Sequence, residues 1–255
     1  MDNYKLKSRA LSGFRSALSF LTIIPAGSED ISDYAHYFFS VIGIVIGMIA
    51  GLIYFISSIY FGRLVAASLA LAALLLVSGF THLDAVLDSG DALMARGDLE
   101  KKRAIMKDHF LGAGAIGTAM VIYIPTFAFL TLFQPVTGLV LIIMAETVSK
   151  FSMITMLAGC STFGEGLAKR FKTLIGKRNR ITVLLNVIPL IFLTFLIFPQ
   201  FLLAFIMTVV VFIISSKVLE RIFHGVNGDI IGLNAEFSRL VYLAAFALLM
   251  VLMFR

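Results

Sequence analysis

The sequence predicts an all-α, polytopic integral membrane protein: a helical bundle of about seven transmembrane helices with an interfacial helix at the N-terminus. Two observations support this prediction. Of the 255 residues, 60% are apolar and only 14% are charged, which is too hydrophobic for an ordinary soluble domain. Several intervals lack Asp, Glu, Lys and Arg over about 20 residues, the length of helix that crosses a hydrocarbon core of about 30 Å. No internal repeat or linker is visible, so residues 1–255 are predicted to form a single membrane domain.

The N-terminal segment over residues 16–27 is expected to lie at the membrane interface. Its apolar stretch is too short to span a bilayer and ends at Pro25. Cations followed by a short apolar run resemble a secretory signal, but a small-x-small cleavage pattern is missing. An interfacial or re-entrant helix is therefore preferred over a cleaved signal peptide.

The remaining apolar segments form seven candidate spans. The first two are separated by Arg63. The next four form two hairpins, because Pro135 and Pro199 interrupt long uncharged runs and proline favours a turn over a helix interior. The last span begins near Arg239, whose stem can reach the interface. The predicted spans cover residues 37–61 and 64–82, a pair around the uncharged run 109–145, a pair within 181–216, and 237–254.

The distribution of cations predicts the orientation of the chain. Lysine and arginine gather in the N-terminal tail and after the second, fourth and sixth spans. Because cytoplasmic connections retain cations, we expect a multi-pass protein of the cytoplasmic membrane with its N-terminus and its acid-rich site facing the cytoplasm. The net charge of +6 then follows from insertion and attraction to anionic lipid. The bilayer is therefore an expected partner and nucleic acid is not. The sequence leaves open whether the protein forms a homo-oligomer.

An acidic stripe follows the second span. Asp84, Asp88 and Asp91 are four and seven residues apart, so a helix would place them on one face. Like charges at this spacing repel, which suggests a compensating cation, and oxygen ligands suit magnesium, manganese or calcium. The alternative is a solvated polar face. Because the stripe continues directly from an apolar span, with His82 at the boundary, a functional site is preferred.

Cations follow the stripe at Arg96, at the cluster 101–103 and at Lys107, which precedes Asp108. Carboxylates that hold a metal beside cations are the groups that phosphoryl transfer requires, since metal and cations neutralise phosphate oxygens and a carboxylate can accept the proton of an attacking hydroxyl. The cluster 101–103 could equally serve as a positive-inside anchor. These residues therefore point to a class of reaction and not to a substrate.

Two further polar features lie elsewhere in the chain. The stretch 224–236 contains Asp229 and Glu236 together with glycines that permit a turn or broken helix, and it is a candidate second wall of the site. Glu146 and Lys150 are one helical turn apart within the fourth span. They are read either as a neutralised structural pair or with Lys150 reaching a phosphate.

The motifs GFTHLDAVLDSGDAL, residues 79–93, and IMKDHFLGAGAIG, residues 105–117, resemble the signature of the cobalamin synthase family. SALSFLTIIPAG, FFSVIGIVIG, FGEGLAK and NGDIIGLNAE extend the resemblance over nearly the whole chain in order. It implies a magnesium-dependent membrane enzyme, an adenosylcobinamide-GDP ribazoletransferase. A hydroxyl of α-ribazole, or of its 5'-phosphate, would attack the corrinoid-side phosphorus of adenosylcobinamide-GDP and release GMP.

The resemblance also implies roles for individual residues. The expected magnesium ligands are Asp84, Asp88, Asp91 and Asp108. The residues expected to take part in catalysis are Asp91, His82 and Lys107. Those expected to bind substrate are Arg96, Lys150, Asp229 and Glu236. The chain departs from the family pattern at Ala85 and Ala92, where glycine is common, and at Lys150, where arginine is expected.

Two other functions remain compatible with parts of the sequence. A CDP-alcohol phosphotransferase of phospholipid synthesis also uses clustered aspartates on membrane helices, but Ala92 and Arg96 match its pattern only in part. A transporter could use the acidic stripe with Glu146 and Lys150 as a permeation site, although no inverted halves are visible.

Overall fold

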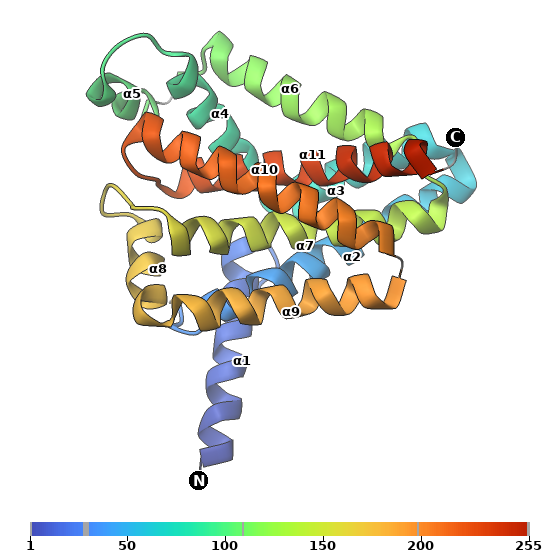
Figure 1. The fold of residues 1–255 in the computed structure, drawn as a ribbon, viewed down its shortest axis with the longest axis horizontal. Coiled ribbons are helices and arrows are strands. Elements are labelled where there is room, and N and C mark those ends of the chain that lie inside the picture. Colours follow the sequence, from blue (N-terminus) through green and yellow to red (C-terminus); the bar gives the residue numbers. More distant parts are fainter. Residues whose placement is uncertain (1, 28–30, 109, 198, 254–255) are drawn as a thin grey trace.

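The fold of the computed structural model is a bundle of α-helices, described over residues 2–27, 31–108, 110–197 and 199–253 (Figure 1). Within these residues the only β feature is an isolated bridge between Thr162 and Val226. The predicted all-α class is confirmed. The helices are α1 (Asp2–Leu21), η1 (Ala35–Tyr37), α2 (Phe39–Phe61), α3 (Arg63–Val77), α4 (Thr81–Met94), α5 (Leu99–Ile105), α6 (Ala113–Leu130), α7 (Pro135–Gly159), α8 (Leu167–Ile175), η2 (Gly176–Arg178), α9 (Asn179–Ile197), α10 (Pro199–Phe223) and α11 (Gly228–Met253).

Helices occur at all seven predicted span positions, but they do not all qualify as spans. Five described helices are long and apolar enough to cross a membrane, namely α2, α6, α7, α10 and α11. α3 and α4 qualify only as a pair bent by 89°, which would make a sixth, and the described apolar part of α9, Asn179–Thr194, is shorter. The chain is a multi-pass membrane protein, and the predicted count of about seven is approximate.

Two predicted boundaries are corrected. The second span ends at Val77 instead of residue 82, because Gly79 and Phe80 adopt left-handed backbone angles (φ 63° and 58°) that turn the chain into α4. The last helix begins at Gly228 instead of residue 237. The side chain of Asn227 accepts a hydrogen bond from the backbone N–H of Ile230 at 3.0 Å and so caps the start of α11.

Helix α1 lies across the long helices and projects from the bundle (Figure 1). It extends further toward the N-terminus than the predicted segment 16–27 and ends at Leu21. Its inward face includes Gly13, Ala17 and Leu21, which recur every fourth residue and are buried. A crosswise direction is the one expected of an interfacial helix.

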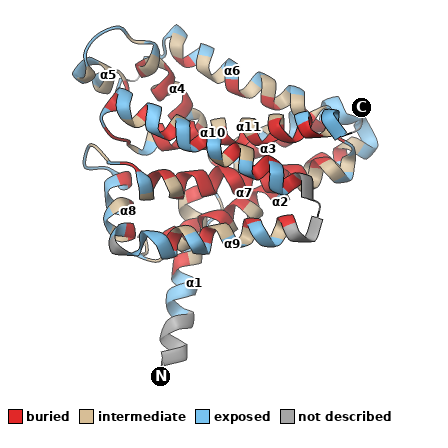
Figure 2. Ribbon diagram, in the orientation of Figure 1, coloured by how far each residue is buried: buried red, intermediate tan, exposed pale blue. Residues whose placement is uncertain are grey.

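Helix α7 forms the centre of the bundle, and all its residues from 144 to 154 are buried (Figure 2). Glycines on α2 let the two backbones approach closely, as in small-xxx-small membrane packing. A Cβ atom added at Gly47 would lie 2.6 Å from the Cα of Ile143, and one at Gly43 would lie 2.8 Å from the Cα of Thr147. Because the neighbouring atoms belong to the backbone of α7, they cannot move aside to make room for an added methyl group.

We expect Gly47→Ala to destabilise the protein by about 1–3 kcal/mol, the usual cost of overpacking a core. The measurement is thermal unfolding in detergent. Gly117→Ala on α6 is the matched control, since nothing lies within 4 Å of an added Cβ there and alanine is the better helix former. Equal stability of the two variants would contradict close α2–α7 packing.

Asn186 connects α9 to the junction of η1 and α2. Its side chain donates to the carbonyl of His36 and accepts from the backbone N–H of Ser40, both at 2.9 Å. The His36 ring is buried, and neither ring nitrogen has a hydrogen-bond partner in the described part of the chain. Burial, assisted by the charge of Arg178, lowers the pKa of His36 from 6.5 to about 4.

The lowered pKa of His36 predicts a pH dependence of stability. Between pH 6.5 and 4 the unfolded chain binds a proton that the folded protein does not, so stability should fall as the pH decreases through this window and should be unaffected by His36 above it. His36→Gln should show a smaller loss between pH 7.5 and 5 than the wild type. Thermal unfolding at the two pH values measures this, and identical losses would contradict it.

Candidate functional site

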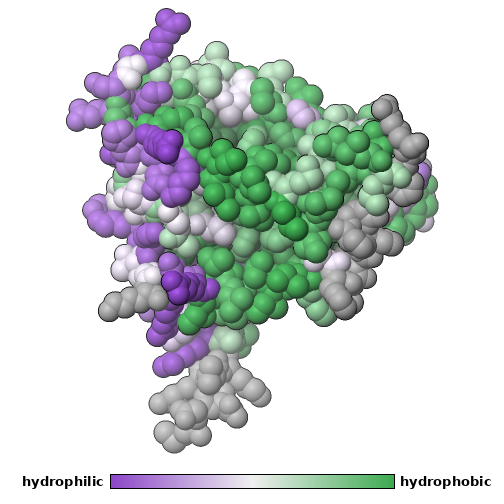
Figure 3. Space-filling view, viewed as in Figure 1, coloured by the Kyte–Doolittle hydropathy of each residue, from purple (hydrophilic) through white to green (hydrophobic). Residues whose placement is uncertain are grey.

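Polar residues gather at one end of the bundle, near α5 and α8 and the connection between α10 and α11 (Figure 3). The rest of the visible surface is mostly hydrophobic, as expected of a face in contact with lipid. A cavity of about 300 Å³ lies among α1, α2, α4, α7, α8 and α11. Its lining residues are Phe20, Leu21, Phe39, Thr81, His82, Asp84, Ala85, Met153, Leu157, Leu167, Ala168, Phe171, Gly228, Asp229 and Ile231.

Two helix N-termini meet at this cavity, and each carries an acidic residue in its first turn. Asp84 lies at the start of α4 and Asp229 at the start of α11. A Cβ added at Gly232 would lie 2.6 Å from the Cβ of Ala85, so the two helices are in close contact. N-termini carry partial positive charge that favours anions, and the carboxylates supply ligands for a cation. The site therefore offers groups for both parts of a metal–phosphate complex.

His82 lies in the wall of the same cavity. Its side chain is buried, with a relative exposure of 6%, and its Nε2 atom has no hydrogen-bond partner among the residues that the structure describes. A buried, unsatisfied ring nitrogen is costly and is suited to hydrogen-bond a bound molecule. Of the residues predicted from the sequence, His82, Asp84 and Asp229 are thus brought together.

The acidic stripe is helical, but its last member has a separate role. Asp91 accepts hydrogen bonds from the backbone N–H groups of Gly112, at 2.6 Å, and Ala115, at 2.8 Å. Gly112 is the N-cap of α6 and has no capping side chain of its own, so Asp91 caps α6 from a neighbouring helix. Asp88 is half-buried one turn before Asp91. Among the residues that the structure describes, no group of three His, Cys, Asp or Glu side chains is arranged to hold a metal ion.

Three other predicted residues lie at the exposed polar surface outside the cavity lining: Arg96, Lys107 and Asp108. Asp108 accepts a hydrogen bond from the backbone N–H of Phe110 at 3.3 Å. Arg103 from the basic cluster instead reaches across the bundle end. It donates to the carbonyls of Phe223 and His224 at 2.7 and 3.2 Å and lies 4.0 Å from the ring centre of Phe163. It thereby connects α5 to the segment that precedes α11.

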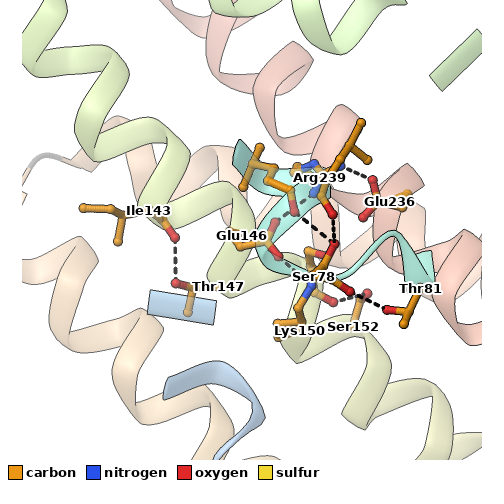
Figure 4. A network of polar contacts seen from close by, with 12 residues as sticks. Ser78, Thr81, Ile143, Glu146, Thr147, Lys150, Ser152, Glu236 and Arg239 are labelled. Atoms are coloured by element: carbon orange, nitrogen blue, oxygen red, sulfur yellow. Dashed lines mark hydrogen bonds and ion pairs between the residues drawn. The ribbon is translucent and has the colours of Figure 1, made fainter. Parts of the chain in front are cut away.

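Lys150 and Glu236, both predicted to bind substrate, lie in a buried network of four charges on α7 and α11 (Figure 4). Glu146 binds Lys150 at 2.5 Å and Arg239 at 2.9 Å, and Arg239 also pairs with Glu236. None of the four side chains is more than 3% exposed. The two positive and two negative charges balance, as buried ions require. The predicted Glu146–Lys150 pair is confirmed, whereas Arg239 is part of the helix interior and does not reach for the interface.

Several residues of the site could not be identified from sequence pattern. Phe20, Phe39 and Phe171 contribute rings to the cavity from three different helices, α1, α2 and α8. In a chain with 24 phenylalanines, nothing in their local sequence distinguishes them. Arg103 likewise bonds to residues about 120 positions away.

Comparisons with known proteins give consistent results. Residues 13–247 match the family model described as cobalamin-5-phosphate synthase. The chain is 35% identical to an adenosylcobinamide-GDP ribazoletransferase of Picrophilus torridus over 91% of this chain and 96% of the relative. Proteins of the same name from Thermoplasma volcanium and Methanosarcina barkeri are 32% and 29% identical, covering 91% and 94% of this chain and 89% and 93% of the relatives. No solved structure matches the chain.

Proposed function

Because the chain belongs to the cobalamin-5-phosphate synthase family, we propose that it catalyses the reaction for which its relatives are named, adenosylcobinamide-GDP ribazole transfer. The adenosylcobinamide-phosphate group passes from adenosylcobinamide-GDP to a ribose hydroxyl of α-ribazole or its 5'-phosphate. A new P–O bond forms, the bridging P–O bond of the diphosphate breaks, GMP leaves, and adenosylcobalamin or its 5'-phosphate is the product. Membership of this family argues against the two alternative functions, a CDP-alcohol phosphotransferase and a transporter.

The observation that carries this proposal is the meeting of two acid-bearing helix N-termini at one cavity beside His82. The partial positive charge of the α4 and α11 N-termini favours the diphosphate of the donor. His82 lies in the cavity wall, its Nε2 has no hydrogen-bond partner among the described residues, and it is the proposed acceptor of the proton of the attacking hydroxyl. The helix N-termini and His82 would thus act at the atoms on which charge develops during phosphoryl transfer.

We propose that magnesium is the cofactor. In phosphate-transfer sites Mg²⁺ is held by one or two carboxylates and completes its shell with substrate phosphates and water. Asp84 and Asp229 in the cavity wall meet this requirement, with Asp88 on the next turn of α4. Asp91 fits less well, since both its oxygens accept backbone hydrogen bonds. When bound, the ion would neutralise phosphate oxygens of the donor.

The proposed orientation places the polar end of the bundle in the cytoplasm. Its support is the gathering of lysine and arginine in the N-terminal tail and in the connections that include α5 and α8, two helices of this end. Glu165→Cys tests it, because Glu165 is exposed and the native Cys160 is buried. A membrane-impermeant maleimide should label this variant in inside-out vesicles and not in intact cells; the reverse pattern would overturn the orientation.

The activity is tested with detergent-solubilised protein, adenosylcobinamide-GDP, α-ribazole and magnesium. GMP and a cobalamin product should form in equal amounts. Neither should form when EDTA removes the divalent ions. Absence of both products from folded protein would overturn the proposed reaction. Full activity in EDTA would overturn the magnesium proposal alone.

A further inference from the structure

Resting on the proposed function, we infer that the apolar end of the cavity, which contains Phe20, Phe39 and Phe171, binds the flat base of the acceptor nucleoside, α-ribazole. The residues that line the cavity fall into two chemically distinct groups, which we call its polar end and its apolar end. Its polar groups are those of Thr81, His82, Asp84 and Asp229, at the starts of α4 and α11. The other lining side chains are apolar, and they come mainly from α1, α2, α7 and α8.

Three phenylalanine rings form a cluster at the apolar end. Phe20 of α1 lies 6.0 Å from Phe39 of α2 and 5.2 Å from Phe171 of α8, measured between ring centres. Phe39 and Phe171 are 5.4 Å apart and nearly perpendicular, at 77°. Phe39 and Phe171 are buried, whereas Phe20 is only half-buried. Rings arranged edge to face offer both faces and edges to another planar ring.

The size of the cavity selects among the groups that the reaction brings together. A volume of about 300 Å³ is at the lower limit of small-molecule sites. It suits a nucleoside, whereas a corrin macrocycle with its side chains is several times larger. The corrinoid, together with the adenosyl group bonded to its cobalt, must therefore remain outside. Of the other two aromatic bases, either that of the acceptor or the guanine of the donor remains as the occupant.

The chemistry of the lining favours the acceptor base. Guanine presents an amide and an amino group that need hydrogen-bond partners once they are buried. The apolar end is lined by side chains such as Phe20, Phe171, Met153 and Leu157, none of which supplies a donor or acceptor for that edge. The 5,6-dimethylbenzimidazole ring of α-ribazole instead carries two methyl groups and has a single free ring nitrogen. It gains from apolar burial without leaving an amide unsatisfied.

This placement also orients the reacting hydroxyl. With the base among the phenylalanines, the ribose extends toward the polar end, where none of the described residues forms a hydrogen bond with the Nε2 atom of His82. Asp84 and Thr81 are exposed at this end, so the diphosphate can approach from outside while the corrinoid stays in solvent or at the membrane surface. Helix α1, which contributes Phe20 and Leu21, thereby forms part of the acceptor site.

The test is a comparison of KM values for the two substrates in Phe20→Leu. Loss of one aromatic contact should raise the KM for α-ribazole roughly 3- to 10-fold and leave the KM for adenosylcobinamide-GDP unchanged. Phe246→Leu is the matched control: Phe246 stacks on Phe201 at 4.5 Å, is buried and is outside the cavity lining. It should alter neither KM.

An unchanged KM for α-ribazole in Phe20→Leu, or an equal rise for both substrates, would overturn the acceptor assignment. A second measurement uses wild-type protein and therefore does not depend on whether the Phe20→Leu variant folds. Wild-type protein should prefer α-ribazole to the analogue with unmethylated benzimidazole, and a lack of preference would overturn the inference. These outcomes differ from failure of the proposed function, in which wild-type protein releases no GMP with any acceptor.

Discussion

Asp84→Asn is expected to lower kcat by roughly 100- to 10,000-fold while the protein stays folded. In the proposed site Asp84 is a ligand of the magnesium ion on the donor diphosphate. Such an ion contributes several kcal/mol to stabilisation of the transition state, at about 1.4 kcal/mol per factor of ten. Asparagine keeps the size of the side chain and removes its charge. The measurement is GMP release across a magnesium titration, in which higher magnesium should restore part of the activity.

Asp98→Asn is the matched control for this variant. Asp98 caps α5 by accepting a hydrogen bond from the backbone N–H of Lys101 at 2.9 Å, is exposed and is absent from the cavity lining. Asparagine caps helices about as well as aspartate, so activity should be retained. Full activity of Asp84→Asn at every magnesium concentration would show that Asp84 is not a metal ligand.

Lys150→Met is expected to destabilise the protein by about 3–5 kcal/mol, the usual cost of removing one partner of a buried ion pair. The substitution removes one of the two cations that pair with Glu146 among the described residues, and the other, Arg239, is shared with Glu236. The result would be a net negative charge in the interior of the bundle. Thermal unfolding in detergent measures the loss.

Lys169→Met provides a close control. Lys169 and Glu165 form an i,i+4 pair at 2.5 Å, as Lys150 and Glu146 do, but their side chains are 50% and 87% exposed. An exposed pair contributes at most about 1 kcal/mol. The double variant Glu146→Gln with Lys150→Met should recover much of the stability, because it removes one charge of each sign. If Lys150→Met raised the KM for adenosylcobinamide-GDP without destabilising the protein, Lys150 would be a phosphate ligand instead.

The helices of the membrane domain were largely predictable, because hydropathy and proline act locally. Pro135 begins α7, as the predicted hairpin requires. The corner at Gly79 and Phe80 was missed, since it lies within a run that contains no charged residue and depends on left-handed backbone angles at two residues. The early start of α11 was missed for a related reason: polar residues from Asn227 onward suggest a loop until their partners are known.

The acidic stripe shows how far the site itself could be predicted. Helical spacing correctly places Asp84, Asp88 and Asp91 on one helix. It cannot show that Asp91 caps α6, because that contact depends on how α4 and α6 pack. The partnership of Arg239 with Glu146, 93 residues away, is likewise a property of the tertiary fold. Spacing identifies chemical groups, whereas packing determines which of them face the cavity.

The corner between α3 and α4 has a consequence for the surrounding bilayer. α3 has 15 residues and is about 22 Å long at 1.5 Å per residue, which is roughly 8 Å shorter than a typical hydrocarbon core. Lipids beside α3 must therefore be compressed, or the corner must lie below the level of their headgroups. In either case hydrophobic mismatch is concentrated where α4 and its carboxylates begin. The rate of the reaction is therefore expected to depend on the acyl-chain length of the surrounding lipids, which is a property of the membrane and not of the protein.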